Sequence, residues 1–170
     1  MLIYLSVKDM KQEASTRLLE DLYKKGHLEI EVLELLADAY ARSNNWTEEE
    51  RIHKLIIKQF PQSGSGYNNL GYRYVERNIN NTEAIQLIVR AIELEPKNGL
   101  YYDSLAMAYL RQDKPDMAAS AFEKAVEYCK DSIEVYQHYA DFLKSRGRDK
   151  EAEEYYKKIE ELKKSQGISK

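Results

Sequence analysis

The sequence predicts an all-α fold in which antiparallel helix pairs stack side by side into a solenoid. A pattern of large and small apolar residues recurs roughly every 34 residues between positions 30 and 166, which is the spacing of a helix-pair repeat. Only three prolines and seven glycines interrupt the chain. A mostly helical protein with short turns tolerates so few, whereas a β sandwich or barrel usually needs more turn residues.

The repeat is clearest between residues 99 and 132. With Gly99 as position 1, apolar residues fall at positions 7, 8, 11, 20, 24 and 27, namely Leu105, Ala106, Tyr109, Ala118, Phe122 and Ala125. The same register predicts further units at 30–63, 64–98 and 133–166, of which 64–98 carries one extra residue within 78–81. Residues 1–29 are expected to form an incomplete N-terminal repeat, and residues 167–170 a frayed tail.

Each unit should consist of a helix A and a helix B that cross where both carry a small residue. Positions 8 and 20 meet this condition in most units, with Ala37, Gly71, Ala106 and Ala140 at the first and Ala84, Ala118 and Ala152 at the second. The unit at 30–63 departs from the pattern, because Glu49 stands at position 20 and His53 at position 24. Looser packing is expected there.

Turn residues agree with these helix boundaries. Thr47 and Glu50 have the spacing of a capping box at the start of a B helix. Pro115 suits the first turn of another B helix. In the last unit, Gly147 suits the end of helix A, and Asp149 is a candidate cap for helix B.

Composition excludes several classes of protein. The net charge of −3 argues against nucleic acid as a partner, because a basic face is the expected footprint. The single cysteine, Cys129, allows no intramolecular disulfide. The apolar stretch at residues 1–7 is too short for a signal peptide, and no stretch approaches the ~20 apolar residues of a membrane span. A cytoplasmic location is the default expectation, and a periplasmic one applies if the chain is part of a longer exported protein.

No constellation of residues points to chemistry. His27, His53 and His138 fall in different units, without a cysteine or second histidine at metal-ligand spacing. Nothing in the sequence around Cys129 lowers its pKa, so an inert thiol is expected. The sequence therefore predicts no enzyme activity, no metal and no cofactor.

The repeats resemble the tetratricopeptide repeat family, and in particular repeats common in bacterial proteins. The resemblance rests on Tyr67-x-x-Leu70-Gly71-x-x-Tyr74 in one unit and on Ala118 followed four residues later by Phe122 in the next. It implies a right-handed superhelical solenoid that serves as a protein–protein interaction module, as a scaffold or an assembly factor.

The resemblance also implies where a partner would bind. In this family the A helices line a concave face, and repeat positions 2, 5, 9, 12 and 13 point into it. The residues carried over to this chain, with Asn69 at the edge, are Glu34, Asp38, Asn68, Asn69, Tyr72, Val75, Glu76, Leu100, Asp103, Met107, Leu110, Arg111, Gln137 and Asp141.

The predicted groove has an apolar centre and acidic ends, with two asparagine amides that could bond a peptide backbone. It would suit a protein or peptide with an apolar centre and basic or neutral flanks. The family's clamp for an acidic C-terminus is not expected, because Glu34 and Asp38 would repel a terminal carboxylate.

Two alternatives remain open at this point. One is a self-assembling solenoid that pairs through an apolar N-terminal end near Leu2, Ile3 and Leu5. The other is an RNA-binding helical repeat, which the acidic balance disfavours.

Overall fold

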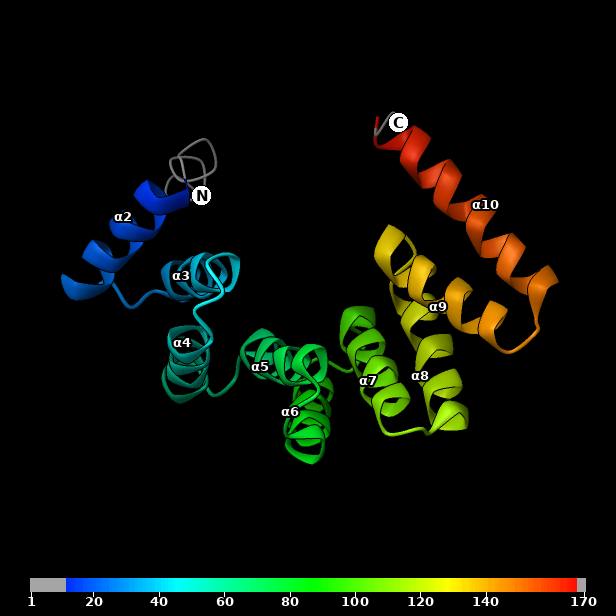
Figure 1. The fold of residues 1–170 in the computed structure, drawn as a ribbon, viewed down its shortest axis with the longest axis horizontal. Helices are drawn as coiled ribbons and strands as arrows, with labels where there is room; N and C mark the ends of the chain where they lie inside the picture. The colour runs from blue at the N-terminus through cyan, green and yellow to red at the C-terminus, as the bar shows by residue number, and fades with distance from the viewer. Residues whose placement is uncertain (1–11, 168–170) are drawn as a thin grey trace. The chain divides into compact units, whose positions relative to one another are not determined.

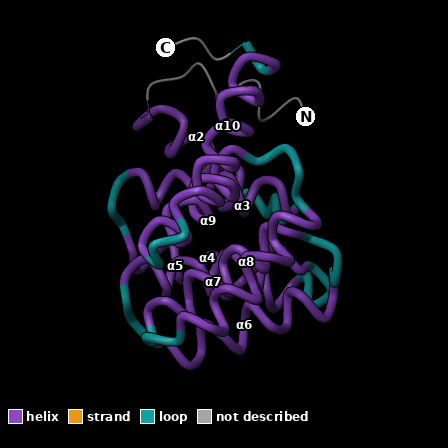
Figure 2. Tube along the Cα trace, turned by 90° about the vertical axis from the view of Figure 1, so that its right-hand side faces the viewer, coloured by secondary structure: helices purple, strands orange, loops and turns teal. Residues whose placement is uncertain are grey.

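The computed structural model describes residues 12–167, and all regular structure among these residues is helical (Figures 1 and 2). The helices are α2 (Gln12–Lys24), α3 (Ile30–Arg42), α4 (Trp46–Gln59), α5 (Gly64–Arg77), α6 (Asn81–Leu94), α7 (Gly99–Arg111), α8 (Pro115–Tyr128), α9 (Ile133–Ser145) and α10 (Asp149–Ser165). The all-α fold with helices packed in adjacent pairs is confirmed. Leu2, Ile3 and Leu5 lie outside the described residues, as do residues 168–170, so self-association through the N-terminal end stays a prediction.

The chain divides into two compact units within α5, one ending at Leu70 and the other beginning at Gly71. We call them the N-terminal unit and the C-terminal unit. Helices α3, α5, α7 and α9 begin at the first residues of the four repeats in the sequence register, so they are the A helices. Helices α4, α6, α8 and α10 are the B helices that follow them.

The N-terminal unit is built around apolar side chains from α2, α3 and α4. Its fully or nearly fully buried members are Leu19, Val32, Leu33, Leu36, Ala37, Ala39, Tyr40, Ile52 and Ile56. Glu49 and His53, where looser packing was expected, also lie in the interior, with His53 Nε2 4.0 Å from Glu49 Oε1. Both side chains belong to α4 and stand one turn apart on its buried face.

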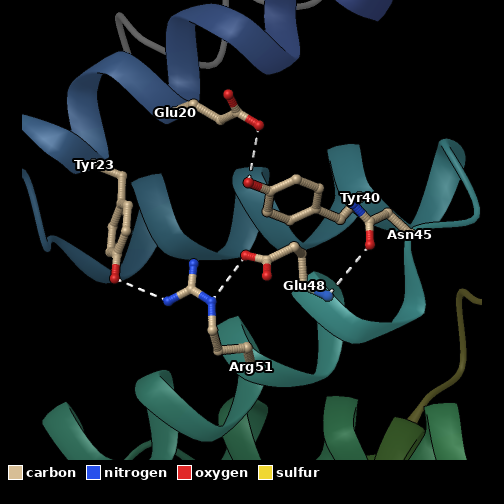
Figure 3. A network of polar contacts seen from close by, with 6 residues as sticks. All are labelled: Glu20, Tyr23, Tyr40, Asn45, Glu48 and Arg51. Atoms are coloured by element: carbon tan, nitrogen blue, oxygen red, sulfur yellow. Dashed lines mark hydrogen bonds and ion pairs between the residues drawn. The ribbon is translucent and has the colours of Figure 1, made fainter.

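A polar network fastens α2 to the rest of the N-terminal unit (Figure 3). The Tyr40 hydroxyl of α3 donates a hydrogen bond of 3.0 Å to Glu20 of α2. Arg51 of α4 donates to the Tyr23 hydroxyl of α2 at 3.0 Å and to Glu48 at 2.8 Å. Burial, followed by the bond to Glu20, raises the pKa of Tyr40 to about 12, so this hydroxyl remains a donor at ordinary pH.

The C-terminal unit has a core of small residues at helix crossings and aromatic rings between repeats. Gly71 shows why the crossing must be small, because a Cβ there would lie 2.8 Å from Ile88 Cγ1 and 2.9 Å from the Ala84 carbonyl oxygen. Between α8, α9 and α10, the Phe122 ring lies 5.7 Å from that of Tyr139, which in turn lies 4.9 Å from that of Tyr155. Such spacings are those of favourable aromatic pairs.

The turn from each A helix to its B helix uses one residue with positive φ. These residues are Asn44, Asn78, Asp113 and Gly147. The residue after each of them donates its N–H to a carbonyl five residues earlier, in the bonds Asn45 to Tyr40, Ile79 to Tyr74, Lys114 to Tyr109 and Arg148 to Leu143, at 2.9–3.0 Å. This closes the end of the A helix in the manner of a Schellman turn. The extra residue between α5 and α6 adds a second positive φ, at Asn80.

The helix starts confirm some turn predictions and correct others. Pro115 is the first residue of α8, and Gly147 follows the end of α9, as predicted. The capping prediction for Thr47 is wrong, because Asn45 is the cap of α4 and its side chain accepts from the Glu48 N–H. Asp149 is not a cap either, since it lies inside α10, which begins after Arg148 without a side-chain cap.

Candidate functional site

Helix α7 has two different faces. Tyr102, Leu105 and Tyr109 turn toward α8, where they line an open pocket of about 400 Å³ with Met117 and others. The opposite side of α7 carries the predicted site residues at helical spacing, namely Leu100, Asp103, Met107, Leu110 and Arg111. Leu100 is 47% exposed and Leu110 is 36% exposed, Met107 is half-buried and Arg111 is exposed. This second side of α7 therefore presents large apolar groups to solvent.

Neighbouring A helices extend this surface within the C-terminal unit. From α5 come Tyr72, which is half-buried, and Glu76, which is exposed and accepts a bond of 2.6 Å from Arg73. From α9 come Glu134, Gln137, His138 and Asp141. We call this set, together with the α7 residues, the α5–α7–α9 face. It consists of Tyr72, Glu76, Leu100, Asp103, Met107, Leu110, Arg111, Glu134, Gln137, His138 and Asp141.

Val75 does not join this face, which corrects the expectation of an apolar centre there. Its side chain is only 2% exposed, so it offers almost no surface to a partner. The physical reason is the hydrophobic effect, since withdrawing an isopropyl group from water is worth about 1.5–3 kcal/mol. The exposed apolar groups of the face are instead those of α7.

Asp103 and His138 form a pair that joins α7 to α9. His138 Nδ1 lies 2.8 Å from Asp103 Oδ2, and the Asp103 side chain is 8% exposed while that of His138 is 23% exposed. The other carboxylate oxygen, Oδ1, is buried and has no hydrogen-bond partner among the described residues. Asp103 was predicted to face a partner directly, and the structure instead holds it beneath the surface of the face.

The environment of this pair is electrically negative. Burial raises the pKa of Asp103, against the opposing effect of His138, and the hydrogen bond from Asp103 raises the pKa of His138. Burial also raises the pKa of Tyr72 to about 12, and the charges of Glu76, Glu134 and Asp103 add to that rise. The charge of Glu134 thus acts on side chains from α5, α7 and α9.

Asp141 and Gln137 are engaged with each other rather than free. The Gln137 amide donates to both Asp141 oxygens at 3.0 Å, and the Tyr156 hydroxyl of α10 donates to Asp141 Oδ1 at 2.7 Å. These bonds hold the Asp141 carboxylate in place at the α9 edge of the face. Its negative charge is one of those that raise the pKa of His138.

The remaining predicted residues belong to the N-terminal unit. Glu34 is half-buried and accepts a bond of 2.8 Å from the Ser65 hydroxyl, whereas Asp38 is exposed. Asn69 is half-buried, and Asn68 is buried with its Oδ1 lacking a hydrogen-bond partner among the described residues. Asn68 and Asp103 both stand at position 5 of their repeats, and each has one such acceptor oxygen.

His138 is the residue that sequence reasoning missed. It stands at repeat position 6, an edge position in the family pattern, and its sequence neighbours lack the spacing of a metal site. The signal that could have found it is its register, because position 6 of one A helix lies beside position 5 of the preceding A helix in this unit, as the contact with Asp103 shows.

Other chemistry is not suggested by the part of the chain that the structure describes. Within residues 12–167, no three histidine, cysteine, aspartate or glutamate side chains are grouped so as to hold a metal ion. Burial raises the pKa of the Cys129 thiol, followed by the charge of Asp131, which makes the thiol less reactive. None of the helices from α2 to α10 is both long and apolar enough to span a bilayer.

Comparisons with known proteins agree on the fold. A family model described as the tetratricopeptide repeat matches residues 101–132 and 133–166. Repeats of this kind are generally protein–protein interaction modules, and the match indicates no enzyme family. No curated protein matches the sequence.

Solved structures of bacterial proteins resemble the chain at low sequence identity. TTC0263, a thermophilic TPR protein in Thermus thermophilus, superposes with a TM-score of 0.77 at 20% identity, over 89% of this chain and 82% of that one. MamA from residue 41 to its end, from Desulfovibrio magneticus RS-1, gives 0.73 at 19% identity, over 97% and 93%. A further MamA crystal structure gives 0.68 at 22% identity, over 93% and 92%. At these identities the likeness establishes the fold alone.

Proposed function

Because the chain is a tetratricopeptide repeat protein, we propose that it binds a partner polypeptide on the α5–α7–α9 face of its C-terminal unit. The partner would be a protein segment with apolar side chains that cover Leu100, Met107 and Leu110, and with basic or neutral flanks. In this role the chain acts as a scaffold or assembly factor and performs no chemistry of its own.

One observation carries the proposal. The α5–α7–α9 face combines exposed leucines with a buried carboxylate oxygen that lacks a donor within residues 12–167, and both features are stabilised when a polypeptide covers them. Exposed apolar groups at a polar-rimmed surface mark interaction sites, and burying them is worth about 25 cal/mol per Å². An unsatisfied buried acceptor costs about 1–3 kcal/mol until a donor reaches it.

The face of α8 is the competing surface. Met117 is 47% exposed and Tyr128 is also exposed, and Met117 lines the open pocket shared with α7. The α8 side therefore offers apolar area too, so a test must distinguish the two faces by matched substitutions.

The experiment compares two variants of the full chain. Leu100→Ser/Leu110→Ser changes the α5–α7–α9 face, and Met117→Ser changes the α8 side at a site as exposed as Leu100. Tyr128 is left unchanged, because it lines a pocket together with Leu100. Binding is measured to an array of peptides with an apolar centre and either basic or acidic flanks, after circular dichroism has shown that both variants are folded. We expect the first variant alone to lose binding, and a preference for basic flanks. Loss in the second variant and retention in the first would place the site on α8 and refute the proposal.

A further inference from the structure

We propose that Asp103, on the α5–α7–α9 face, receives a cationic side chain, lysine or arginine, from the bound partner, and that the proton of His138 competes with it. The proposal rests on the proposed function, because it identifies the side chain that the α5–α7–α9 face would select. In this subsite, the Asp103 carboxylate would bind the cation, and the protonation state of His138 would determine the net charge beside that carboxylate.

Only one of the two carboxylate oxygens of Asp103 has a hydrogen-bond partner among the described residues. The carboxylate belongs to the second turn of α7, its side chain is more than nine-tenths buried, and its bond to His138 Nδ1 uses Oδ2. Oδ1 accepts from no described residue. Buried polar atoms in proteins are nearly always hydrogen-bonded, so an exception on a candidate binding face asks for a donor from outside the chain.

The charges around Asp103 specify a cationic donor. From α9, Glu134 and Asp141 act on His138 together with Asp103, and from α5, Glu76 and Tyr72 lie within the same field. On α5, the guanidinium of Arg73 is bonded to Glu76. On α7, Arg111 lies eight residues beyond Asp103, about 12 Å along the helix at 1.5 Å per residue. The balance near Asp103 is negative, which favours an ammonium or guanidinium donor over a neutral one.

His138 is the member of the pair whose ordinary pKa, about 6.5, lies nearer to neutral pH. When its imidazole is protonated, it places a positive charge 2.8 Å from Asp103 and reduces the attraction for a second cation. When the imidazole is neutral, it still donates a hydrogen bond to Oδ2 but leaves the carboxylate charge uncompensated. Binding of a cationic side chain and protonation of His138 therefore oppose each other, and each weakens the other by the same factor.

Access to Oδ1 has a consequence that can be observed. Because Oδ1 is buried in the free chain, a partner's N–H reaches it only when the side chains above it turn aside. His138 is the partly exposed member of the pair, so its imidazole should change environment on binding.

The test uses defined peptides and a histidine signal that does not depend on knowing the natural partner. The probes are acetyl-Ala-Leu-Arg-Leu-Ala-amide and its citrulline analogue, which keeps the shape of arginine and removes the charge. Nuclear magnetic resonance follows the imidazole of His138, identified by its loss in His138→Gln. We expect the arginine peptide, and not the citrulline peptide, to shift the His138 signal and to lower its titration midpoint.

Variants separate charge from fold. Asp103→Asn keeps the size of the side chain and should weaken the arginine peptide about tenfold or more, whereas Asp116→Asn, an exposed carboxylate on α8, should change nothing. In the natural chain, affinity for the arginine peptide should rise with pH across the titration of His138, by at most about tenfold per pH unit. In His138→Gln that pH dependence should disappear.

Each outcome decides a different claim. Equal binding of the arginine and citrulline peptides, or no shift of His138 up to about 10 mM arginine peptide, overturns the cationic subsite. If Asp103→Asn does not fold, an affinity of the natural chain that stays flat across the His138 titration overturns it instead. The proposed function fails separately, when Leu100→Ser/Leu110→Ser binds both peptides as well as the natural chain does.

Discussion

Replacing Gly99 by alanine should destabilise the C-terminal unit, although alanine is the better helix former. Gly99 is the first residue of α7 and is buried against the end of α8. A Cβ there would lie 2.5 Å from Cys129 Cβ, 2.6 Å from the Ala125 carbonyl oxygen and 2.7 Å from the Cys129 nitrogen. Two of these three atoms belong to the backbone, so they cannot rotate away.

The magnitude follows from two opposing effects. Exchanging glycine for alanine in a helix gains at most about 1 kcal/mol. Overpacking a well-filled site costs about 1–3 kcal/mol, and rigid backbone neighbours place this site at the upper end or beyond. We expect a net loss of about 2 kcal/mol, which lowers the melting temperature by about 4–8 °C in a domain of this size.

Gly66→Ala is the matched control. Gly66 is also buried near the start of a helix, α5, but its Cβ would crowd only the Ile56 side chain, at 2.8 Å from Cγ2. A shifted rotamer costs about 0.5–1.5 kcal/mol, which the helix propensity of alanine offsets. Gly66→Ala should therefore stay within about 0.5 kcal/mol of the natural chain.

Urea unfolding measures both variants. Far-ultraviolet circular dichroism follows the whole chain, and the fluorescence of the single tryptophan, Trp46 on α4, reports the N-terminal unit. Gly99→Ala should lower the circular dichroism midpoint. An unchanged or raised midpoint, or an equal loss in Gly66→Ala, would refute the reasoning from backbone crowding.

Three further predictions concern protonation, a network bond and turns. The hydrogen bond to Asp103 raises the folded-state pKa of His138, so its stabilising contribution is complete below the unfolded pKa of about 6.5 and is lost as pH rises through the folded pKa. Urea titrations across that range should show a fall of at most about 1.4 kcal/mol per pH unit, absent in His138→Gln. Tyr40→Phe should cost about 1 kcal/mol in the same assay, and a neutral result would mean that its bond to α2 contributes nothing. Asn44→Gly should gain about 0.5–1 kcal/mol and Gly147→Ala should lose about 1 kcal/mol by calorimetry, and the opposite order would contradict the positive φ at both positions.

The all-α fold could be predicted from the sequence because large and small residues recur with the period of the helix-pair repeat. Gly71 and Ala84 had to be small for two helix backbones to cross, and the structure shows contacts below 3 Å for a Cβ added at Gly71. Such a constraint is local to each helix pair and repeats with it. The cap at Asn45 did not follow, because Asn45 and Thr47 are both good caps by composition, and the positive φ at Asn44 decides where α4 begins.

The candidate site could be predicted only in outline. The family resemblance, carried over by register, placed Leu100 and Leu110 on one face of α7, where the structure shows them exposed. Buried Asp103 contacts His138, which lies 35 residues later in the sequence, and no single-helix pattern contains that contact. Val75 has the same periodicity as Leu110, yet one is buried and the other is not, because exposure depends on the neighbouring side chains.

Position 5 of the repeats connects the fold to the proposed function. Glu34 and Gln137, at this position of the first and last repeats, have their polar groups bonded to Ser65 and Asp141. Asn68 and Asp103, at the same position of the middle repeats, each bury an acceptor oxygen to which no described residue donates. Leaving an acceptor unsatisfied costs the free chain about 1–3 kcal/mol at each position, and an apolar side chain would avoid that cost. A donor from a bound polypeptide would recover that free energy at Asp103, which lies on the proposed binding face, and this is how burial of the acceptor and binding are connected in the proposal.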